Sequence, residues 1–466
     1  MSVVDLPPVQ VMRRKLASSW AWLRSRPPRW YLLAAWLVAI VYAFPGYMNW
    51  DASEQETQAR SGAYGDGHPP LMAACWRLVE HVVRGPFGML VVQVSLFLWG
   101  LYAVFRLRFR PRTAAVIASA LFLFPPILTP MTVVWKDAQM AAFLLAGIML
   151  ALRTSWRARG AGLALLFLGV GVRHNAPFAL PSLCLFVAVS WGVRRKLVAA
   201  ALALGMALLV TGSALYVNSR IGAREYWWYR TFAIHDLVGT ICLSDPMTDE
   251  QVRTALAGIP LLVESDLQRD MCKAYDPRVW FSASFGDHRV FGQVPDADER
   301  KARGAAWKRV VLAHPYEFLA HRWRVMKEVL GLTSSPIWEP VCQEFGANHY
   351  QMDHLKEIHT QSWFQAAYGG LAVRLGRTLA YRPWAYLLVG LAMLGYALRK
   401  RDGWLVAILT SGFLYESTYF IGAPSPDFRY SHWMVLCCCI AAVTVFGERL
   451  RDGLRRRAEV TCPPSA

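Results

Sequence analysis

The sequence predicts an all-α protein that crosses a membrane about ten times and carries a mainly helical segment outside it. Hydrophobic residues make up 55% of the chain, and Trp occurs 20 times. Apolar runs of roughly 17 to 22 residues recur, long enough to cross the hydrocarbon core of a bilayer. The predicted spans cover residues 30–48, 86–105, 114–135, 138–152, 161–172, 176–192, 197–217, 383–398, 404–422 and 431–447.

The connections between these spans alternate in charge. Basic residues precede the first span and follow every second one, as in the run Arg106, Arg108, Arg110 and Arg112. The other short connections hold only Lys136, Arg173 and Arg429. Since cytoplasmic loops carry the excess of Lys and Arg, both termini are predicted to be cytoplasmic. A signal peptide within residues 24–46 is the alternative interpretation, and nine further spans argue against it.

The formal net charge of +18 reflects this topology and contact with anionic lipids. It therefore does not indicate nucleic-acid binding. The chain contains no Asn-x-Ser/Thr sequon, which favours a bacterial inner membrane over a eukaryotic secretory membrane. The functional site is then expected on the periplasmic face of that membrane.

The chain divides into a membrane module (1–217), an extracytoplasmic segment (218–382) and three closing spans with a basic tail (383–466). In the extracytoplasmic segment, Thr248 and Gln251 form a predicted capping box. After His314-Pro315, a helix is predicted to place His321, Arg322 and Lys327 away from an apolar stripe. That stripe comprises Phe318, Leu319, Met326, Val329 and Leu330. Cys242 and Cys272 could form a disulfide in an oxidising compartment, which leaves Cys342 as the odd cysteine of this segment.

The first outer loop, 49–85, has a pattern of its own. Residues 51–60 suit a helix, and Gly62 begins a Gly-rich break. Pro70 can open a second, amphipathic helix along the membrane surface, with apolar residues at helical spacing. These are Leu71, Ala74, Cys75, Leu78 and Val82. His68 then lies at a helix N-terminus, where free amides favour an anion such as phosphate.

Ionisable residues at the membrane boundary gather on the face opposite the basic loops. They are Asp51, Asp66, His68, Lys136, Asp137, Arg173, His174, Asp427 and Arg429. Charges at the rim of an apolar slab are costly, so their presence favours a binding function. The sequence therefore predicts an extracytoplasmic site for an anionic, lipid-linked substrate.

Four segments carry a family resemblance. Asp51 followed by Gly-Ala-Tyr-Gly-Asp-Gly-His-Pro-Pro-Leu at 62–71 resembles the first outer loop of GT-C superfamily glycosyltransferases. The nearest groups are bacterial family 39 type proteins, related to protein O-mannosyltransferases and lipid A aminoarabinose transferases. Trp-Lys-Asp at 135–137, Arg-His-Asn at 173–175 and Asp-Phe-Arg-Tyr at 427–430 support the resemblance.

The resemblance implies a GT-C fold and a transferase that moves a sugar from a polyprenyl-phosphate carrier to a hydroxyl acceptor. Asp51 would be the catalytic base. The chain departs from the family at Ala52, where a second acid is usual, and Glu54 is the nearest substitute. Participation of a divalent metal therefore stays open.

The chemistry explains why few residues would suffice. A phosphate leaves already stabilised, so one base for the acceptor and cations for the phosphate are enough, whereas glycoside hydrolysis needs two carboxyl groups. We expect Lys136, Arg173 and His68 to hold the phosphate. The remaining predicted substrate contacts are Asp66, Asp137, His174, Arg429 and Tyr430.

Each assignment has a structural alternative. Asp51 with Glu54 also fits a capping box, Lys136 a snorkelling lysine, and Asp137 a helix cap. Asp427 and Arg429 also fit an ion pair that closes a loop. The run Tyr226-Trp227-Trp228-Tyr229 fits an interfacial aromatic belt, and a metal site at His235 and Asp236 is a minor possibility.

Two other functions use the same features. A lipid-linked glycan transporter would hold the phosphate without chemistry, but it usually shows internal repeats, and none is visible here. An O-antigen polymerase or ligase would rely on Arg and His residues of the extracytoplasmic segment. In that case alanine at Arg322 or His314 would be more harmful than alanine at Asp51.

Overall fold

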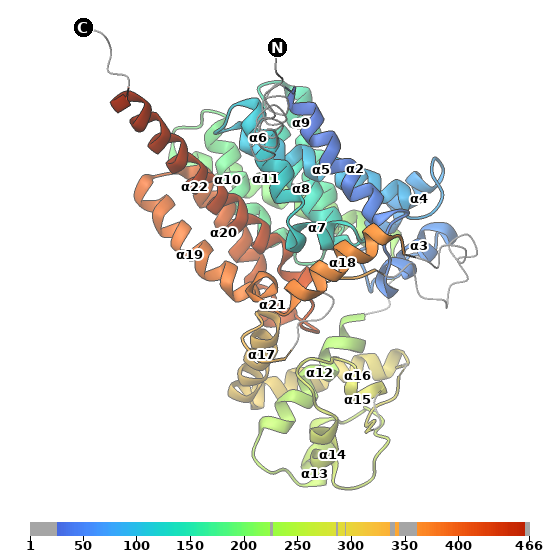
Figure 1. The fold of residues 1–466 in the computed structure, drawn as a ribbon. Coiled ribbons are helices and arrows are strands. Elements are labelled where there is room, and N and C mark those ends of the chain that lie inside the picture. Colours follow the sequence, from blue (N-terminus) through green and yellow to red (C-terminus); the bar gives the residue numbers. More distant parts are fainter. Residues whose placement is uncertain are drawn as a thin grey trace, which may run out of the picture.

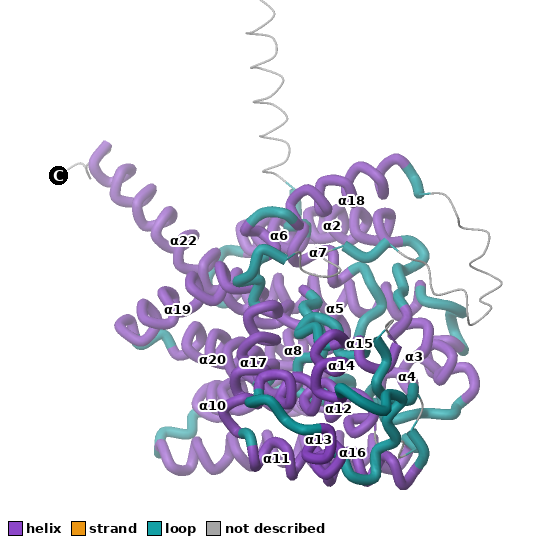
Figure 2. Tube along the Cα trace, turned by 90° about the horizontal axis from the view of Figure 1, so that it is seen from below, coloured by secondary structure: helices purple, strands orange, loops and turns teal. Residues whose placement is uncertain are grey.

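A computed structural model describes residues 26–223, 227–285, 288–293, 295–335, 341–343 and 361–461. Helices and loops alone make up this part of the chain (Figure 2), and its extended pairings are three isolated bridges. The protein is therefore all-helical, as predicted. The basic residues that precede residue 26, and Tyr226 of the aromatic run, lie outside the described ranges.

Every predicted span falls on one helix or on a pair of helices. In chain order they are α2 (Pro28–Ala43), α5 (Phe87–Arg106), α6 (Pro111–Phe122) with α7 (Pro125–Met131), α8 (Lys136–Ala151), α9 (Trp156–Gly171), η1 (Ala176–Ala179) with α10 (Leu180–Ser190), α11 (Lys196–Ile221), α19 (Pro383–Lys400), α20 (Gly403–Ser417) with α21 (Tyr419–Gly422), and η5 (Phe428–Ser431) with α22 (His432–Thr461).

Four of the described helices are long and apolar enough to cross a membrane: Phe87–Arg106, Lys196–Ile221, Gly403–Gly422 and Phe428–Gly453. The pair α6 and α7 makes a fifth candidate, but it bends by 74°. Pro125 and Pro126 explain the bend because proline lacks an amide hydrogen and clashes with the preceding turn. Residues 114–135 thus form a broken helix, where the sequence predicted an uninterrupted one.

The full set of ten spans is not confirmed. Helices α2, α8 and α9 have 16 residues each. At a rise of 1.5 Å per residue such a helix is about 24 Å long, shorter than a hydrocarbon core of about 30 Å. The structure is compatible with a membrane protein that combines long spans with shorter, buried helices.

Helix α8 lies at the centre of the membrane part, with all but one of its residues buried. It packs closely against α9, because glycines face each other across the contact. A Cβ on Gly162 would lie 2.7 Å from the carbonyl oxygen of Gly147 and 2.4 Å from the amide nitrogen of Ala151. Small residues of this kind let two helix backbones approach closely in a membrane.

Several of the basic loops meet at one end of the helices. Arg108 forms an ion pair with Asp402 at 2.7 Å, and Arg451 donates to the carbonyl of Arg108 at 3.1 Å. The start of α2 and the end of α22 both lie at this end, at the top of Figure 1. This arrangement agrees with the alternation of charge along the sequence.

The segment predicted to be extracytoplasmic forms a separate body, which we call the extracytoplasmic body, at the opposite end, seen at the bottom of Figure 1. It contains α12 (Trp227–Leu243), α13 (Asp249–Ala255), α14 (Leu267–Ala274), α15 (Ser282–Phe285), α16 (Ala297–Ala313) and α17 (Pro315–Val329), packed around a second hydrophobic core. Thr248 and Gln251 form the predicted capping box, and Cys242 is disulfide-bonded to Cys272. By contrast, α18 (Trp363–Gly376) lies along the membrane helices, against α2 and α7.

Helix α17 begins at Pro315 as expected, but its buried face was predicted wrongly. His321 and Arg322 are buried together with Met326 and Val329, whereas Leu319 is 48% exposed. The apolar periodicity failed here because a carboxylate inside the extracytoplasmic body provides a partner for both polar side chains.

The first outer loop folds into two helices, α3 (Trp50–Ser61) and α4 (Pro70–Glu80). Asn49 caps α3, since its side chain accepts a hydrogen bond from the amide of Ala52 at 3.3 Å. Asp51 therefore lies in the first turn and is not the cap. Gly62 ends α3 with a left-handed backbone (φ 76°), which glycine adopts without strain.

Helix α4 is attached to the membrane part at its first turn. The amide of Leu71 donates to the side chain of Asn218 on α11 at 2.9 Å. Of the predicted apolar stripe, Leu71 is buried, whereas Leu78 and Val82 are exposed. The far half of the segment therefore presents apolar residues outward, as an amphipathic helix on a membrane surface would.

Candidate functional site

Backbone pairing brings the first outer loop to the start of α8. Tyr47 pairs with Val133, and the amide of Val134 donates to the carbonyl of Tyr47 at 2.9 Å. The indole nitrogen of Trp135 donates to the Asn49 side chain at 2.8 Å. Because Asn49 also caps α3, this contact sets the start of α3 beside the start of α8.

Asp51 consequently faces three cationic or imidazole groups from distant segments. Its Oδ2 lies 2.8 Å from Arg429 Nη2 and 3.4 Å from Lys136 Nζ, and its Oδ1 lies 3.8 Å from His68 Nε2. The Asp51 side chain retains 23% of its exposure, whereas those of His68, Lys136 and Arg429 retain less than 10%. We call these four residues the Asp51 cluster.

His68 connects the cluster to α3 on a second side. Its Nδ1 lies 2.6 Å from Lys136 Nζ, and its Nε2 lies 3.5 Å from Glu54 Oε2. Burial and the neighbouring Lys136 ammonium lower the pKa of His68. A neutral ring with an unprotonated Nδ1 can accept a hydrogen bond from Lys136, so His68 orients the lysine rather than adding charge.

The carboxylate of Asp51 is strongly stabilised. Burial alone would raise its pKa, but the attraction of Arg429 and Lys136 outweighs burial and holds the pKa well below its usual range. Asp51 is thus ionised throughout the neutral range, ready to accept hydrogen bonds.

A second group of residues lies next to the Asp51 cluster. Arg173 Nε contacts Asp137 Oδ1 at 3.2 Å, and Arg173 Nη2 donates to the Tyr419 hydroxyl at 3.0 Å. The hydroxyls of Tyr415 and Tyr419 are 2.8 Å apart. These contacts hold the guanidinium of Arg173 in one orientation between α8 and α21.

Tyr430 joins the two groups. The guanidinium of Arg173 lies 5.1 Å from the centre of the Tyr430 ring, and that of Arg429 lies 5.4 Å from it. Arg429 also lies 4.7 Å from the centre of the Trp135 ring and 2.6 Å from Asp427 Oδ2. Cations over aromatic faces are favourable, most of all where water is scarce.

The formal charges of the site nearly cancel. Three cations, Lys136, Arg173 and Arg429, are matched by the carboxylates of Asp51, Asp137 and Asp427. An anion that enters must therefore share cations with a carboxylate that already holds them. The most accessible carboxylates are those of Asp51 and Glu54, with 23% and 33% exposure.

The structure brings together most, but not all, of the predicted site residues. Asp51, His68, Lys136, Arg429 and Tyr430 meet directly, and Arg173, Asp137 and Asp427 adjoin them. His174 lies at the rim of the site, on the turn that follows α9: its side chain is accessible, yet the surrounding protein together with Lys136, Arg173 and His68 lowers its pKa to about 3. Asp66 is partly exposed on the loop between α3 and α4.

Sequence reasoning missed Tyr415 and Tyr419. Both are buried: Tyr415 lies near the end of α20, Tyr419 begins α21, and their hydroxyls are in contact. Their hydroxyls were the available signal, because a Tyr buried in an apolar helix usually has a polar partner.

The described residues contain no group of three or more His, Cys, Asp or Glu side chains arranged to hold a metal ion. At the position considered for a metal, the side chain of Asp236 faces Arg322 and His321 instead. His235 lies against the backbone carbonyl of Asp276 at 3.2 Å. The Asp236 carboxylate is therefore already bound to the side chains of Arg322 and His321.

Comparisons with protein families, with curated proteins and with solved structures find no match to this chain.

Proposed function

We propose that the protein is a membrane glycosyltransferase of GT-C fold. It would transfer a sugar from a polyprenyl-phosphate-linked donor to a hydroxyl acceptor on the extracytoplasmic face of a bacterial inner membrane. The observation that carries the proposal is the meeting of Asp51 with His68, Lys136 and Arg429. These residues come from separate segments of the chain, and they combine a carboxylate with groups suited to a phosphate.

In the proposed reaction, Asp51 takes the proton of the acceptor hydroxyl. The acceptor oxygen attacks the anomeric carbon of the sugar as the bond from that carbon to the phosphate oxygen breaks, inverting the configuration. The bonding electrons leave with the phosphate, whose growing charge is stabilised by Lys136 and Arg429. A general base contributes about 10²–10⁴-fold to such a step.

The ion pairs imply an order of events. With Arg429 and Lys136 both bound to it, Asp51 is a weak base, because these contacts stabilise its ionised form. A phosphate that binds the same two cations weakens their hold on Asp51 and makes it more basic. In this mechanism the donor binds first and thereby activates the base for the acceptor.

The Arg173 group has a supporting role. Arg173 is already bound to Asp137 and Tyr419, and it stacks on Tyr430. It adds positive potential beside the phosphate position and holds the Tyr430 ring against which Arg429 packs. This differs from the direct phosphate contact expected from the sequence.

A deletion strain tests the proposed function. Mass analysis of its surface glycans and lipids should show one sugar substituent missing, with its polyprenyl-phosphate donor accumulated. The wild-type gene and a control variant, Asp298→Asn, should restore the substituent, since the Asp298 side chain is 94% exposed and distant from the site. Asp51→Asn should not.

The same experiment separates the alternatives. Restoration by Asp51→Asn, with loss only in variants of Lys136 and Arg429, would indicate a transporter. Loss of long glycan chains rather than of a single substituent would indicate a polymerase or ligase.

A further inference from the structure

A second cluster of charges lies where the extracytoplasmic body meets the membrane part. Asp236 on α12 forms an ion pair with Arg322 on α17 at 2.5 Å and contacts His321 Nε2 at 3.2 Å. It also accepts a hydrogen bond from the indole nitrogen of Trp307 on α16 at 2.7 Å. The side chains of Asp236, His321 and Arg322 are at most 1% exposed. We call these four residues the Asp236 cluster.

Arg322 extends from this cluster to the loop that carries Arg429. Its Nη2 holds Asp236, while its Nη1 donates to the carbonyl of Ala423 at 3.1 Å. Ala423 directly follows α21 and is fully buried. Helix α17 also contacts both α21 and η5. One guanidinium thus bridges the two bodies of the protein.

The loop from Ala423 to Tyr430 is stiff. Pro424 and Pro426 fix two of its backbone φ angles. Asp427 then holds the next turn, since its side chain accepts from the amide of Arg429 at 3.1 Å and its carbonyl accepts from the amide of Tyr430 at 3.1 Å. A shift at Ala423 would therefore be passed on to Arg429 rather than absorbed.

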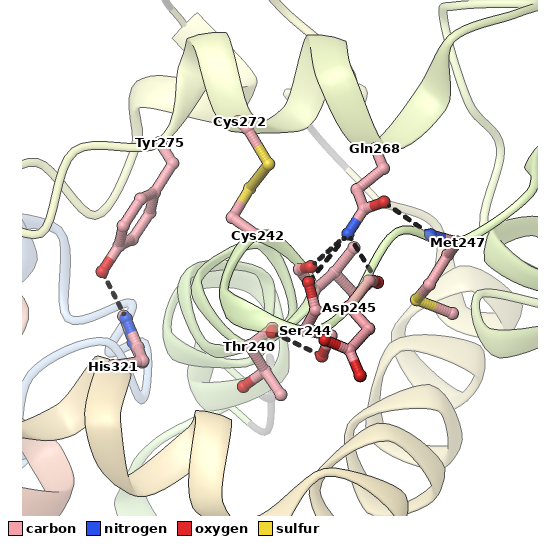
Figure 3. The surroundings of a disulfide bond; sticks show 10 residues. Thr240, Cys242, Ser244, Asp245, Met247, Gln268, Cys272, Tyr275 and His321 are labelled. Carbon is pink, nitrogen blue, oxygen red and sulfur yellow. Dashed lines mark hydrogen bonds between the residues drawn. A yellow bond between two sulfur atoms is a disulfide. The ribbon is translucent and has the colours of Figure 1, made fainter.

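The extracytoplasmic body fixes the other side of the Asp236 cluster. The disulfide between Cys242 and Cys272 ties α14 to α12 (Figure 3), and Gln268 donates to the carbonyl of Ile241 at 2.8 Å. The Tyr275 hydroxyl, three residues beyond Cys272, lies 3.0 Å from His321 Nδ1. Both ring nitrogens of His321 therefore have a partner, Asp236 at Nε2 and Tyr275 at Nδ1.

We propose that Arg322 is a positioning residue, which sets the loop 423–430 and hence the place of Arg429 against Asp51. Only an arginine has the planar fork that can bind a carboxylate and a carbonyl at once in this geometry. The position of the loop follows from contacts described above. Its effect on substrate binding rests on the proposed function.

Hydrogen–deuterium exchange on the full-length protein in lipid nanodiscs tests the positioning directly. Arg322→Ala and Arg322→Lys should speed amide exchange across 423–430 by about tenfold or more, corresponding to the loss of about 1.4 kcal/mol of local protection. Asp236→Asn, which leaves Arg322 without its charged partner, should do the same.

The matched control is Arg309→Ala. Arg309 is an arginine of the same body, but it donates to the carbonyls of Ala255 and Ala257 within that body. Its replacement should leave exchange across 423–430 unchanged. Equal exchange across this loop in the wild type and in folded Arg322→Lys or Asp236→Asn would overturn the proposal.

Binding of undecaprenyl phosphate provides a second readout, which a merely structural role would not reproduce. Arg322→Lys should weaken binding in the wild-type background but have little further effect once Arg429 is replaced by Lys, because it acts through Arg429. Additive losses in the double variant contradict positioning. If the wild type does not bind this lipid, the proposed function fails, whereas the exchange experiment still decides the role of Arg322.

Discussion

The Asp51 and Asp236 clusters are built from similar residues, yet they differ in access. Each has an aspartate held by an arginine and a histidine, with a tryptophan in contact. Asp51 retains 23% of its exposure and is shared among three partners at distances of 2.8 to 3.8 Å. Asp236 retains 1% and is closed in by donors from α16 and α17.

This difference separates a site that can exchange partners from one that cannot. A ligand can compete for the cations around Asp51, because that carboxylate is accessible and its contacts with Lys136 and His68 are long, at 3.4 and 3.8 Å. The Asp236 contacts are short and sealed, so a ligand has no route to them. Residue types alone do not distinguish the two clusters, whereas exposure and the origin of the partners do.

The largest expected contrast is between the two aspartates as asparagines. Asp51→Asn should reduce transfer by about 10²–10⁴-fold, the usual contribution of a general base, while the protein stays folded. It stays folded because Arg429 keeps Asp427 as a partner. Analysis of glycans from a complemented deletion strain, with gel filtration of the purified variant, measures both effects. Full restoration of the glycan removes the base assignment.

Asp236→Asn should act on stability instead. It leaves Arg322 buried without a counter-charge, a change that costs about 3–5 kcal/mol in comparable cases. Thermal unfolding in nanodiscs should show a clearly lower midpoint for Asp236→Asn than for Asp51→Asn. Similar midpoints for the two variants would mean that the Asp236 cluster is not the sealed structural element described here.

The disulfide allows a test of whether the extracytoplasmic body is stabilised separately from the membrane helices. Replacing Cys242 and Cys272 together by Ser should destabilise the extracytoplasmic body by about 2–4 kcal/mol. Limited proteolysis should then cut the described parts of 227–313 faster, while the membrane helices stay protected. Faster cutting of α5 or α8 would contradict the separation of the two bodies.

Lys136→Met tests the phosphate assignment in the Asp51 cluster. Loss of one charge-assisted contact should weaken undecaprenyl phosphate binding by about 1.5–3 kcal/mol, roughly 10- to 150-fold. Lys327→Met, on α17, serves as the matched control. Equal affinity of the wild type and Lys136→Met excludes Lys136 as a phosphate ligand.

Glu56 offers a comparison on the same helix as Asp51. It is buried and has Arg60 at 2.8 Å, but it lacks the set of cations around Asp51. Burial raises the pKa of Glu56 from 4.5 to about 7, against the opposing effect of Arg60. The folded state therefore binds this proton more tightly, and its contribution to stability is lost as pH rises from about 4.5 to 7.

Glu56→Gln should remove that dependence. The wild type should lose about 1–3 kcal/mol of stability between pH 4.5 and 8 from this group, and the variant should lose less. Unfolding midpoints measured at the two pH values give the comparison. An unchanged pH dependence in the variant would show that the folded and unfolded states bind the Glu56 proton equally, so that burial does not raise its pKa.

Much of the fold could be predicted from the sequence, because apolar runs and the basic loops between them indicate where membrane helices begin and end. Each predicted span corresponds to a helix or a helix pair, and residues from the four segments predicted to be outside do lie together. The bend after α6 was not predicted, although Pro125 and Pro126 were the signal for it. The short helices also could not be told from full spans by hydrophobicity alone.

The site was less predictable, because partner choice depends on three-dimensional packing. The sequence predicted that Arg173 binds the phosphate. In the structure Arg173 forms an ion pair with Asp137 and a hydrogen bond with Tyr419, which in turn contacts Tyr415. The sequence placed Arg322 away from the apolar stripe of its helix, although a carboxylate far away in the sequence makes its burial possible.

The central claim is that the cations of the Asp51 cluster bind the phosphate of a polyprenyl-linked donor. An electron-cryomicroscopy structure of the protein in nanodiscs with undecaprenyl phosphate tests it most directly. The account predicts the phosphate oxygens within about 3 Å of Lys136 Nζ and an Arg429 nitrogen, with Asp51 released from at least one of these groups. A phosphate bound elsewhere, with both Asp51 ion pairs intact, would contradict it.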